Sequence, residues 1–407
     1  MASFTYKDLA FARDGELLRC RLFARYSFTI PWNEVSRLGP CTVKHDELVF
    51  PGVSEKKVHN KMGRLVEDGL CNRLVHELYK KPAVYITSES GIPLIGTNEY
   101  GIVDRGSNII EVKPVTGCNF NCIYCSVDEG KNNKTADYLV EEEYLASVAA
   151  EVAKTKQHPV EFNIGPQGEP LLYPRLVALV RDLRALPQTG VISINTNGSL
   201  LSTKLIDELA AAGLTRINLS IPALDPELAA KLAGVKVFPL AHLLRMLDYG
   251  KDKLSFLLAP VLVPGHNEQE MASIVKLSRT ITSEFPTIGI QNYLSYPKGR
   301  KPVKKPLSWE RFFSFIKELE RTTGTNLTAT KEDFRIHEEK ELPKPFKKGQ
   351  VVEAVIVMPG RYAREMVAAA HNRAITVQML NDRRAIGKRL RVRIVRDKHN
   401  IFKGVPC

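Results

Sequence analysis

Three cysteines, Cys118, Cys122 and Cys125, fall within eight residues of the chain, at spacings of four and three. One short loop can therefore present three thiolates to a metal cluster, and iron–sulfur clusters are usually held by four cysteine thiolates. Because no fourth cysteine follows at this spacing, one iron of a [4Fe-4S] cluster would lack a protein ligand and could bind a cofactor. The alternatives are three unrelated core cysteines or a structural zinc site, although zinc favours paired C-x2-C knuckles and no second knuckle follows.

The stretch from Cys118 to Cys125, with aromatic Tyr124 just before the last cysteine, resembles the cluster loop of the radical S-adenosylmethionine (SAM) superfamily. The resemblance implies that the open iron binds the amino and carboxylate groups of SAM, with Tyr124 among the cofactor contacts. It also implies that an electron from the cluster, supplied by a donor such as ferredoxin or flavodoxin, cleaves SAM to a 5′-deoxyadenosyl radical. That radical abstracts hydrogen from an unactivated C–H bond, and the protein positions and shields it.

The segment 165–170, of sequence Gly-Pro-Gln-Gly-Glu-Pro, is similar to the Gly-Gly-Glu region that contacts the methionine amino group in this superfamily. The match is partial, because Gln167 stands where an adjacent glycine is usual. The resemblance predicts that Gly165, Gly168 and Glu169 bind the cofactor. An ordinary loop between a strand and a helix is the alternative.

Two further strand ends resemble cofactor contacts of the superfamily. The segment 195–198, Asn-Thr-Asn-Gly, is similar to its T-N-G signature and predicts contacts from Asn195 and Asn197. Ser220, at the end of the next expected strand, is the candidate for a contact to the cofactor ribose. A plain Asn-Gly turn and an ordinary strand-end serine are the alternatives. The loop histidine His266 receives no role, and no catalytic side chain is assigned.

Strand and helix patterns alternate through the middle of the chain. Strands are expected at 108–115, 160–164, 191–195, 214–221, 254–263 and 288–294. Helices are expected at 141–156, 172–186, 203–212, 240–250, 267–283 and 309–323. Repeated strand–helix units predict an α/β fold with parallel strands and right-handed crossovers. The family resemblance implies a (β/α)6 partial barrel, whose chemistry would lie at the carboxyl ends of the strands.

Composition bounds the number of domains and the compartment. A chain of 407 residues is long for one domain, and we expect an N-terminal α+β domain at 1–107, a core at 108–325, a linker at 326–345 and a small barrel at 346–407. The first residues contain no apolar signal core, and no run of about eighteen apolar residues occurs. We therefore expect a cytoplasmic protein without a membrane partner, and seven cysteines with three in one cluster motif fit a reducing compartment.

Positive charge is concentrated at the end of the chain. Residues 344–407 hold 15 Lys/Arg against 4 Asp/Glu, a net charge of +11 out of +13 for the whole chain. Short strand-like segments at 351–358, 374–380 and 389–395 predict a small β-barrel that resembles the OB-like or TRAM class. Six arginines there could follow a phosphate backbone, namely Arg361, Arg364, Arg373, Arg383, Arg384 and Arg396. A basic loop at 297–305 could cover an anionic ligand. A solvated surface is the alternative for the basic barrel, and a solvated linker is the alternative for the loop.

Four cysteines lie outside the cluster motif: Cys20, Cys41, Cys71 and Cys407. Four thiolates are the number that closes a tetrahedral iron or zinc site, so a second, structural metal ion is predicted. The alternatives are a second iron–sulfur cluster, or three buried cysteines and one free thiol.

Two functions remain open. The whole layout, including the segment 125–130, Cys-Ser-Val-Asp-Glu-Gly, resembles the methanogenesis marker ten family, the arginine C-methyltransferases of methyl-coenzyme M reductase. That resemblance implies a protein substrate and methylcobalamin as the methyl donor, although no separate N-terminal cobalamin domain is evident. The other function is methylation or methylthiolation of tRNA or rRNA, with the basic barrel binding RNA. The residues around Cys20, Cys41 and Cys71 lack the signatures expected of a methylthiotransferase cluster.

Overall fold

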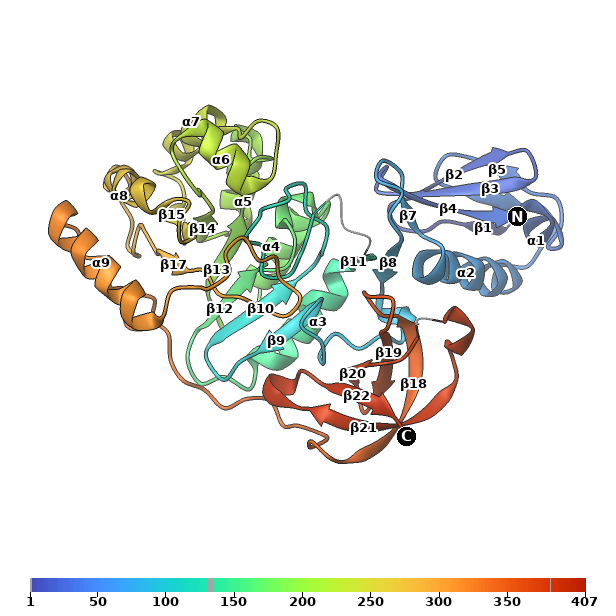
Figure 1. The fold of residues 1–407 in the computed structure, drawn as a ribbon. Helices are drawn as coiled ribbons and strands as arrows, with labels where there is room; N and C mark the ends of the chain where they lie inside the picture. Colours follow the sequence, from blue (N-terminus) through green and yellow to red (C-terminus); the bar gives the residue numbers. More distant parts are fainter. Residues whose placement is uncertain (1, 131–134, 381) are drawn as a thin grey trace. The chain divides into compact units, whose positions relative to one another are not determined.

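The computed structural model describes residues 2–130, 135–380 and 382–407, and these form two compact units (Figure 1). The first unit contains the described residues of 1–97, 134–141 and 345–407, and the second contains those of 98–133 and 142–344. The two ends of the chain therefore belong to one unit. This division cuts across the segment 1–107 expected from the sequence, because residues 98–107 belong to the second unit.

The second unit is built on a six-stranded sheet in the order β15-β14-β13-β12-β10-β9. Its strands are β9 (Gly101–Asp104), β10 (Ile109–Lys113), β12 (Val160–Ile164), β13 (Thr189–Thr196), β14 (Arg216–Leu219) and β15 (Ser255–Leu258). The five strands from β10 to β15 run parallel and follow chain order, whereas β9 pairs antiparallel with β10 at one edge. Apolar residues alternate with polar residues along β12, β13 and β14, so one face of the sheet packs on apolar side chains and the other carries polar ones.

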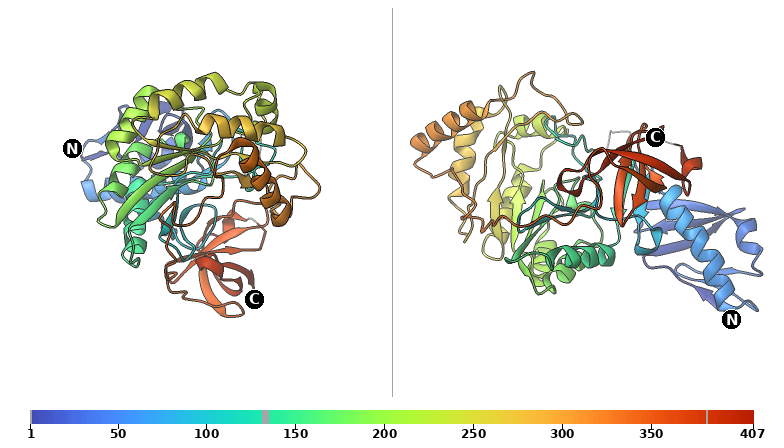
Figure 2. Two further views of the ribbon diagram at one scale, coloured as in Figure 1. Left: turned by 90° about the vertical axis from the view of Figure 1, so that its left-hand side faces the viewer. Right: turned by 90° about the horizontal axis from the view of Figure 1, so that it is seen from below.

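Helices connect the parallel strands and pack around them (Figure 2). They are α3 (Glu142–Ala153), α4 (Leu176–Arg184), α5 (Thr203–Ala212), α6 (Pro226–Ala233), α7 (Leu240–Gly250), α8 (Met271–Ser278) and α9 (Trp309–Thr323). Helix α5 illustrates the local signals: the Ser202 side chain accepts from the Leu205 N–H at its start, and Gly213 ends it at φ +96°. Short 3-10 turns occur at 170–172 and 268–270.

The last two expected strands of the core differ from the structure. The expected strand at 254–263 is broken into β15 and β16 (Val261–Leu262), because Pro260 has no N–H to donate to a neighbouring strand. The expected strand at 288–294 is reduced to β17 (Gln291–Asn292), which pairs parallel with β16 in a separate two-stranded sheet. The unit is thus an α/β structure, and its description as a (β/α)6 partial barrel stays a prediction.

The N-terminal part of the first unit contains two small sheets and a helix. One sheet has the order β1-β6-β5 and the other β2-β3-β4-β7. Their strands are β1 (Ala2–Phe4), β2 (Leu9–Asp14), β3 (Leu17–Leu22), β4 (Tyr26–Pro31), β5 (Thr42–Val43), β6 (Leu48–Phe50) and β7 (Val75–His76). Helix α2 (Glu55–Asn72) buries Val58, Met62 and Val66, which are spaced four residues apart and lie along one face. The short helix α1 (Trp32–Ser36) and a parallel pair, β8 (Ala83–Ile86) with β11 (Asp137–Val140), complete this part.

The C-terminal part of the first unit is a closed barrel with the strand order β18-β19-β20-β22-β21. Its strands are β18 (Val351–Pro359), β19 (Met366–Ala370), β20 (Arg373–Val377), β21 (Arg389–Arg396) and β22 (Lys403–Pro406). Buried Phe346, Ile375 and Phe402 fill its core. Short 3-10 turns lie at 88–90, 383–385 and 398–400 of this unit, and no described helix of either unit is long and apolar enough to span a membrane.

Candidate functional site

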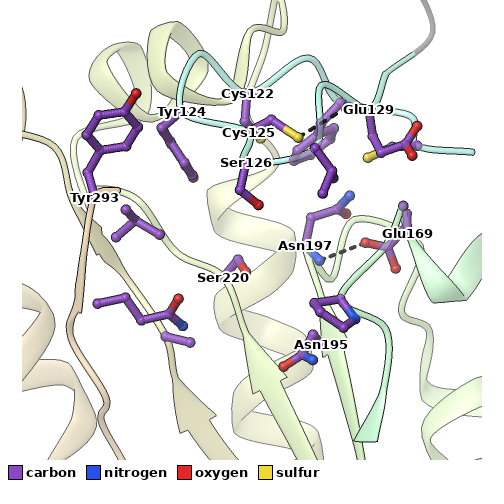
Figure 3. A pocket seen from close by; sticks show the side chains of 18 of the residues that line it. Cys122, Tyr124, Cys125, Ser126, Glu129, Glu169, Asn195, Asn197, Ser220 and Tyr293 are labelled. Atoms are coloured by element: carbon purple, nitrogen blue, oxygen red, sulfur yellow. Dashed lines mark hydrogen bonds between the residues drawn. The ribbon is translucent and has the colours of Figure 1, made fainter. Parts of the chain in front are cut away.

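The carboxyl ends of the parallel strands carry the loops that the sequence motifs predicted. The cysteine loop follows β10, the segment 165–170 follows β12, the segment 195–198 lies at the end of β13, and Ser220 follows β14. Parallel strands place these ends at one edge of a sheet, which is where ligands bind in open α/β proteins. A cavity of about 470 Å³ lies at this edge, and Figure 3 shows the side chains that line it.

All three cysteines of the loop line this cavity, and none of them forms a disulfide. Burial raises the pKa of all three thiols, to about 12 for Cys122, and the charge of Cys125 raises the pKa of Cys122 further. Thiols with raised pKa values stay protonated until a metal replaces their protons. The N–H of Glu129 also donates to Cys125 Sγ at 3.2 Å, and such donors suit a sulfur that carries cluster charge.

The cysteine loop has no regular secondary structure, and the end of α6 holds part of it. The Asn121 N–H donates to the Ala233 carbonyl at 3.1 Å, and the Ile123 N–H donates to the Leu232 carbonyl at 2.9 Å. Gly234, at φ +62°, lies directly under this contact, because a Cβ atom there would approach the Asn121 carbonyl oxygen to 2.1 Å. Only glycine therefore permits the helix end and the loop to meet in this way.

Arg300 binds the other side of the cysteine loop through four hydrogen bonds. Its backbone N–H donates to the Cys125 carbonyl at 2.9 Å, and its Nη1 donates to the Cys122 carbonyl at 2.8 Å. Its Nη2 donates to the Glu129 carbonyl at 2.8 Å, and its Nε donates to Asp128 Oδ1 at 2.6 Å. One guanidinium fork thus fixes the loop on both sides of the last cysteine.

The chain beside Arg300 is shaped for this contact. A Cβ atom at Gly299 would lie 2.8 Å from the Ser126 carbonyl oxygen, so the close approach requires glycine. The Tyr293 hydroxyl donates to the Arg300 carbonyl at 2.8 Å. The basic loop at 297–305, for which the sequence left a ligand cover or a solvated linker open, therefore supports the cysteine loop at Arg300.

The turn after β12 packs against the start of the cysteine loop. Gly168 has φ +68°, and a Cβ atom there would lie 2.6 Å from the Thr116 and Gly117 carbonyl oxygens. The buried Glu169 carboxylate accepts from the Thr196 hydroxyl at 2.6 Å and from the Asn197 N–H at 2.8 Å. Burial raises the pKa of Glu169 to about 7, although these donors favour its ionised form. Glu169 thus joins the turn to the end of β13, in addition to lining the cavity.

The side chain of Asn197 is largely engaged by its neighbours. Its Nδ2 donates to Asn119 Oδ1 at 2.9 Å, and its Oδ1 accepts from the Ser199 hydroxyl at 2.6 Å. Asn119 Nδ2 in turn donates to Ser199 Oγ at 2.9 Å, which closes a triangle between the cysteine loop and the end of β13. Asn197 lines the cavity and at the same time holds the two loops together.

Of the other residues predicted to bind the cofactor, Tyr124, Asn195 and Ser220 line the cavity, and Gly165 does not (Figure 3). Burial, followed by the charge of Cys122, raises the pKa of the Tyr124 hydroxyl well above its usual value. Gly165 instead lies over Asn195, because a Cβ atom at Gly165 would be 3.3 Å from the Asn195 Cβ. Gln167, at the position that departs from the family pattern, is buried and donates to the Glu129 carboxylate.

Sequence reasoning missed one wall of the cavity. Gln291, Asn292, Tyr293 and Tyr296 line it from β17 and the segment that follows. The signal was present, because polar and aromatic residues end the expected strand at 288–294, as they do at the other strand ends. Sequence reasoning also missed Glu129, which lines the cavity from beyond the last cysteine.

The four cysteines predicted to hold a second metal are not brought together. Cys20 is buried in β3, Cys71 lies on α2, Cys41 lies before β5, and Cys407 is exposed. No group of three His, Cys, Asp or Glu side chains able to hold a single ion occurs among the described residues. The loop cysteines form no such group either, but each thiolate of a four-iron cluster would bind its own iron, so their three sulfurs need not meet at one point.

The predicted arginines of the C-terminal barrel differ in accessibility. Arg361 is buried and its Nη2 donates to Thr135 Oγ1 at 2.8 Å, so it is not available to a phosphate. The exposed side chain of Arg384 pairs with Asp382 at 2.9 Å. Three other arginines, Arg389, Arg391 and Arg393, alternate along the exposed face of β21.

A family model for the radical SAM superfamily matches residues 112–278 of the chain. An uncharacterized protein of Methanocaldococcus jannaschii is 36% identical over 402 residues, which cover 92% of this chain and 91% of that protein. The GTP 3′,8-cyclase of Crocosphaera subtropica is 34% identical over 177 residues, which cover 42% of this chain and 50% of that enzyme. The chain thus matches about half the length of this second relative.

Among solved structures, Streptococcus suis SuiB bound to S-adenosylmethionine aligns with 79% of this chain and 70% of its own. Its sequence identity is 13% and its TM-score is 0.42.

Proposed function

The chain belongs to the radical SAM superfamily, and on this basis we propose that it is a methyltransferase acting on an unactivated carbon of a protein arginine. The proposed protein substrate is methyl-coenzyme M reductase. Residues 112–278 match the model of the radical SAM superfamily, which supports a radical SAM enzyme.

One observation carries the finer proposal. The segment that follows the last cysteine, on which the resemblance to arginine C-methyltransferases depends, forms part of the cavity wall through Ser126, Val127 and Glu129. This segment continues directly from Cys125, so its side chains face the space beside the three thiols. Its position beside the cysteines fits a role in holding the substrate side chain near the cofactor.

The residues present fit a [4Fe-4S] cluster and SAM. Cys118, Cys122 and Cys125 would hold three irons, and Tyr124, Asn195 and Ser220 would line the space for SAM. When bound, the reduced cluster and SAM supply the 5′-deoxyadenosyl radical. Glu169 and Asn197 keep the surrounding loops in register, and Arg300 fixes the cysteine loop. The cavity of about 470 Å³ is of the size that encloses one small-molecule ligand.

Methylcobalamin does not fit this cavity together with SAM. A corrin ring with its nucleotide tail is much larger than SAM, and the cavity is already the size of a single small ligand. A corrinoid would therefore have to extend beyond the residues that line this cavity. Methylcobalamin as the methyl donor is proposed from the family resemblance.

Mass spectrometry of the proteome from a strain that lacks this gene tests the arginine proposal. Loss of a methyl group from one arginine of methyl-coenzyme M reductase, restored by the wild-type gene and not by Cys122→Ala, is the expected result. An unchanged peptide mass together with the loss of a modified nucleoside from tRNA or rRNA would contradict it. A visible spectrum of the anaerobically purified protein adds a second readout, because a bound corrinoid absorbs where the cluster alone does not peak.

A second candidate function, modification of RNA, is favoured by a specific surface. Arg389, Arg391 and Arg393 project from the exposed face of β21, with Val351 and Glu353 of β18 as neighbours across the strand pair. Alternate residues of a strand lie about 7 Å apart, so three guanidinium groups form a regular row. Such a row can contact successive phosphates of a nucleic acid.

The triple variant Arg389→Gln, Arg391→Gln and Arg393→Gln tests this candidate. If RNA binds the row, the slope of log affinity against log salt falls by about 0.7 to 0.9 for each phosphate that the variant no longer neutralises. Filter binding to total tRNA over a series of salt concentrations measures the slope. The control Lys154→Gln, Lys204→Gln and Lys236→Gln removes the same charge from exposed positions of the second unit. Equal slopes for both triple variants would eliminate the RNA candidate.

A further inference from the structure

Six polar side chains form a closed hydrogen-bonded ring on one face of three adjacent strands, below the cavity. Strands β12, β13 and β14 each contribute two residues spaced two apart, which places all six on the same face of the sheet. We call this set the polar ring. Its members are Glu161, Asn163, Ser193, Asn195, Arg216 and Asn218.

A buried ion pair begins the ring. Arg216 Nη2 donates to Glu161 Oε1 at 2.5 Å, and the two side chains are only 4% and 6% exposed. The guanidinium also lies over the rings of Phe285 at 5.0 Å and Phe334 at 5.3 Å, which hold it in place. Removal from water lowers the pKa of Arg216, whereas Glu161 raises it.

The ion pair determines the direction of the hydrogen bonds on both sides. A carboxylate only accepts and a guanidinium only donates. Ser193 Oγ must therefore donate to Glu161 Oε1, which it does at 2.6 Å. On the other side, Arg216 Nε donates to Asn218 Oδ1 at 2.9 Å, which leaves the Nδ2 of Asn218 to donate onward.

The series of hydrogen bonds that starts at Glu161 and the series that starts at Arg216 meet at Asn195. The one hydroxyl hydrogen of Ser193 is donated to Glu161. The Ser193 oxygen can therefore only accept, and it accepts from Asn163 Nδ2 at 2.7 Å. Asn163 then presents Oδ1 to Asn195 Nδ2 at 2.7 Å, and Asn218 Nδ2 donates to Asn195 Oδ1 at 2.9 Å. An amide can in principle rotate by about 180° and exchange its donor and acceptor ends. Here both ends of Asn195 are set by groups that cannot exchange roles.

Asn195 is also the one member of the polar ring that lines the cavity (Figure 3). Gly165 lies over Asn195, and a Cβ atom at Gly165 would be 3.3 Å from the Asn195 Cβ. The Asn195 side chain is therefore closely packed as well as hydrogen-bonded. The ring thus connects a buried charge pair to a single polar group at the wall of the cavity.

Stability alone does not explain the ion pair. Glu161 Oε2 and Arg216 Nη1 are buried without a hydrogen-bond partner among the described residues. A buried pair with unsatisfied atoms is often no more stable than apolar residues of similar size. The ion pair is better explained by the hydrogen-bond directions that it sets in the polar ring.

We propose that Glu161 and Arg216 are positioning residues, which fix the donor and acceptor ends of the Asn195 amide for a neutral polar group of SAM. The inference rests on the proposed SAM site, because it concerns how one residue of that site is oriented. Neither Glu161 nor Arg216 lines the cavity, so both would act only through the polar ring.

The test compares SAM binding in a set of variants, measured by equilibrium dialysis on protein with a reconstituted cluster. The double variant Glu161→Gln with Arg216→Met removes both charges at once and leaves no unpaired buried charge. We expect it to weaken SAM binding about tenfold, and Asn195→Ala to weaken it by a similar factor. Combining all three changes should give no further loss, because the pair acts through Asn195. The maximal rate of 5′-deoxyadenosine formation should fall less than the affinity.

Ser193→Ala supplies a milder variant that keeps the ion pair and cuts the ring one residue away, and we expect a smaller loss of affinity from it. Ser278→Ala is its control, since this hydroxyl is buried in α8 and donates to the Val275 carbonyl, away from the ring. Wild-type affinity in Ser193→Ala and the double variant, or losses that add to that of Asn195→Ala, would overturn the inference. Wild-type affinity in Asn195→Ala would instead contradict the proposed SAM contact itself.

Discussion

The three loop cysteines and the four remaining cysteines carry the same thiol group, but only the three loop cysteines line one cavity. Cys118, Cys122 and Cys125 lie on one loop, line one cavity and influence the pKa values of one another. In the first unit, burial likewise raises the pKa of Cys20, Cys41 and Cys71, but no other cysteine contributes to these shifts. A pKa raised by burial is common to the loop cysteines and to Cys20, Cys41 and Cys71, whereas the influence of one cysteine on another is seen only in the loop.

The difference shows what short spacing contributes. A loop of eight residues brings three thiolates together at little cost in chain entropy, whereas four cysteines spread over the chain need the fold to assemble them. The first unit uses its cysteines for packing instead: Cys20 lies opposite Phe11 and Phe28 in neighbouring strands. The number of thiolates alone therefore predicted a site that the structure does not assemble.

Replacing a loop cysteine should have the largest effect. Cys118→Ala, Cys122→Ala and Cys125→Ala each remove the anchor of one iron, so each variant should retain little iron after desalting. Iron and sulfide counts on anaerobically reconstituted protein give the measurement, with Cys71→Ala as the matched control. A variant that still held four irons per chain would show that the assigned cysteine is not a ligand.

Arg300→Met should have the second largest effect. It removes the three side-chain hydrogen bonds to the cysteine loop, and bonds from a charged donor contribute about 1.5 to 3 kcal/mol each. We expect iron to pass to a chelator at least tenfold faster than from the wild type. The exposed Lys305→Met removes the same charge from the same basic loop and should leave the rate unchanged. Equal rates in Arg300→Met and wild type would mean that the loop is held by its other contacts.

The scattered cysteines should give smaller effects, on stability and not on metal content. Cys20→Ser places a hydroxyl in a buried strand position and should lower the free energy of unfolding by about 1 to 3 kcal/mol. Cys407→Ala changes an exposed residue and should lower it by less than about 0.5 kcal/mol. Urea denaturation measures both. Loss of a zinc or iron ion from either variant would restore the second metal site that the sequence suggested.

Much of the fold was predictable because local signals decided it. The helix at 203–212 has its serine cap and terminal glycine, and the helix expected at 309–323 coincides with α9. The barrel strands β19 and β22 were missed, since the Ala-rich run at 366–370 and the glycine and proline in 403–406 do not favour strands. These two segments form strands because the barrel closes through them, which is a tertiary effect.

The candidate site was predictable where it lies on motifs and not where distant segments meet. The strand-end residues Asn195 and Ser220 line the cavity, as expected. The role of Arg300 on the cysteine loop could not be predicted, because only the tertiary fold brings Arg300 next to Glu129. The two residues are 171 positions apart in the chain. The polar ring likewise depends on the register of three strands, which sequence patterns do not specify.

Formation of 5′-deoxyadenosine is the most direct test of the claim that the loop cysteines make this chain a radical SAM enzyme. The reconstituted protein is reduced with dithionite in the presence of SAM, and the product is measured by mass spectrometry. We predict that the wild type forms 5′-deoxyadenosine and that the combined variant Cys118→Ala, Cys122→Ala and Cys125→Ala forms none. Equal amounts from both proteins, or none from a wild type that carries four irons and binds SAM, would contradict the claim.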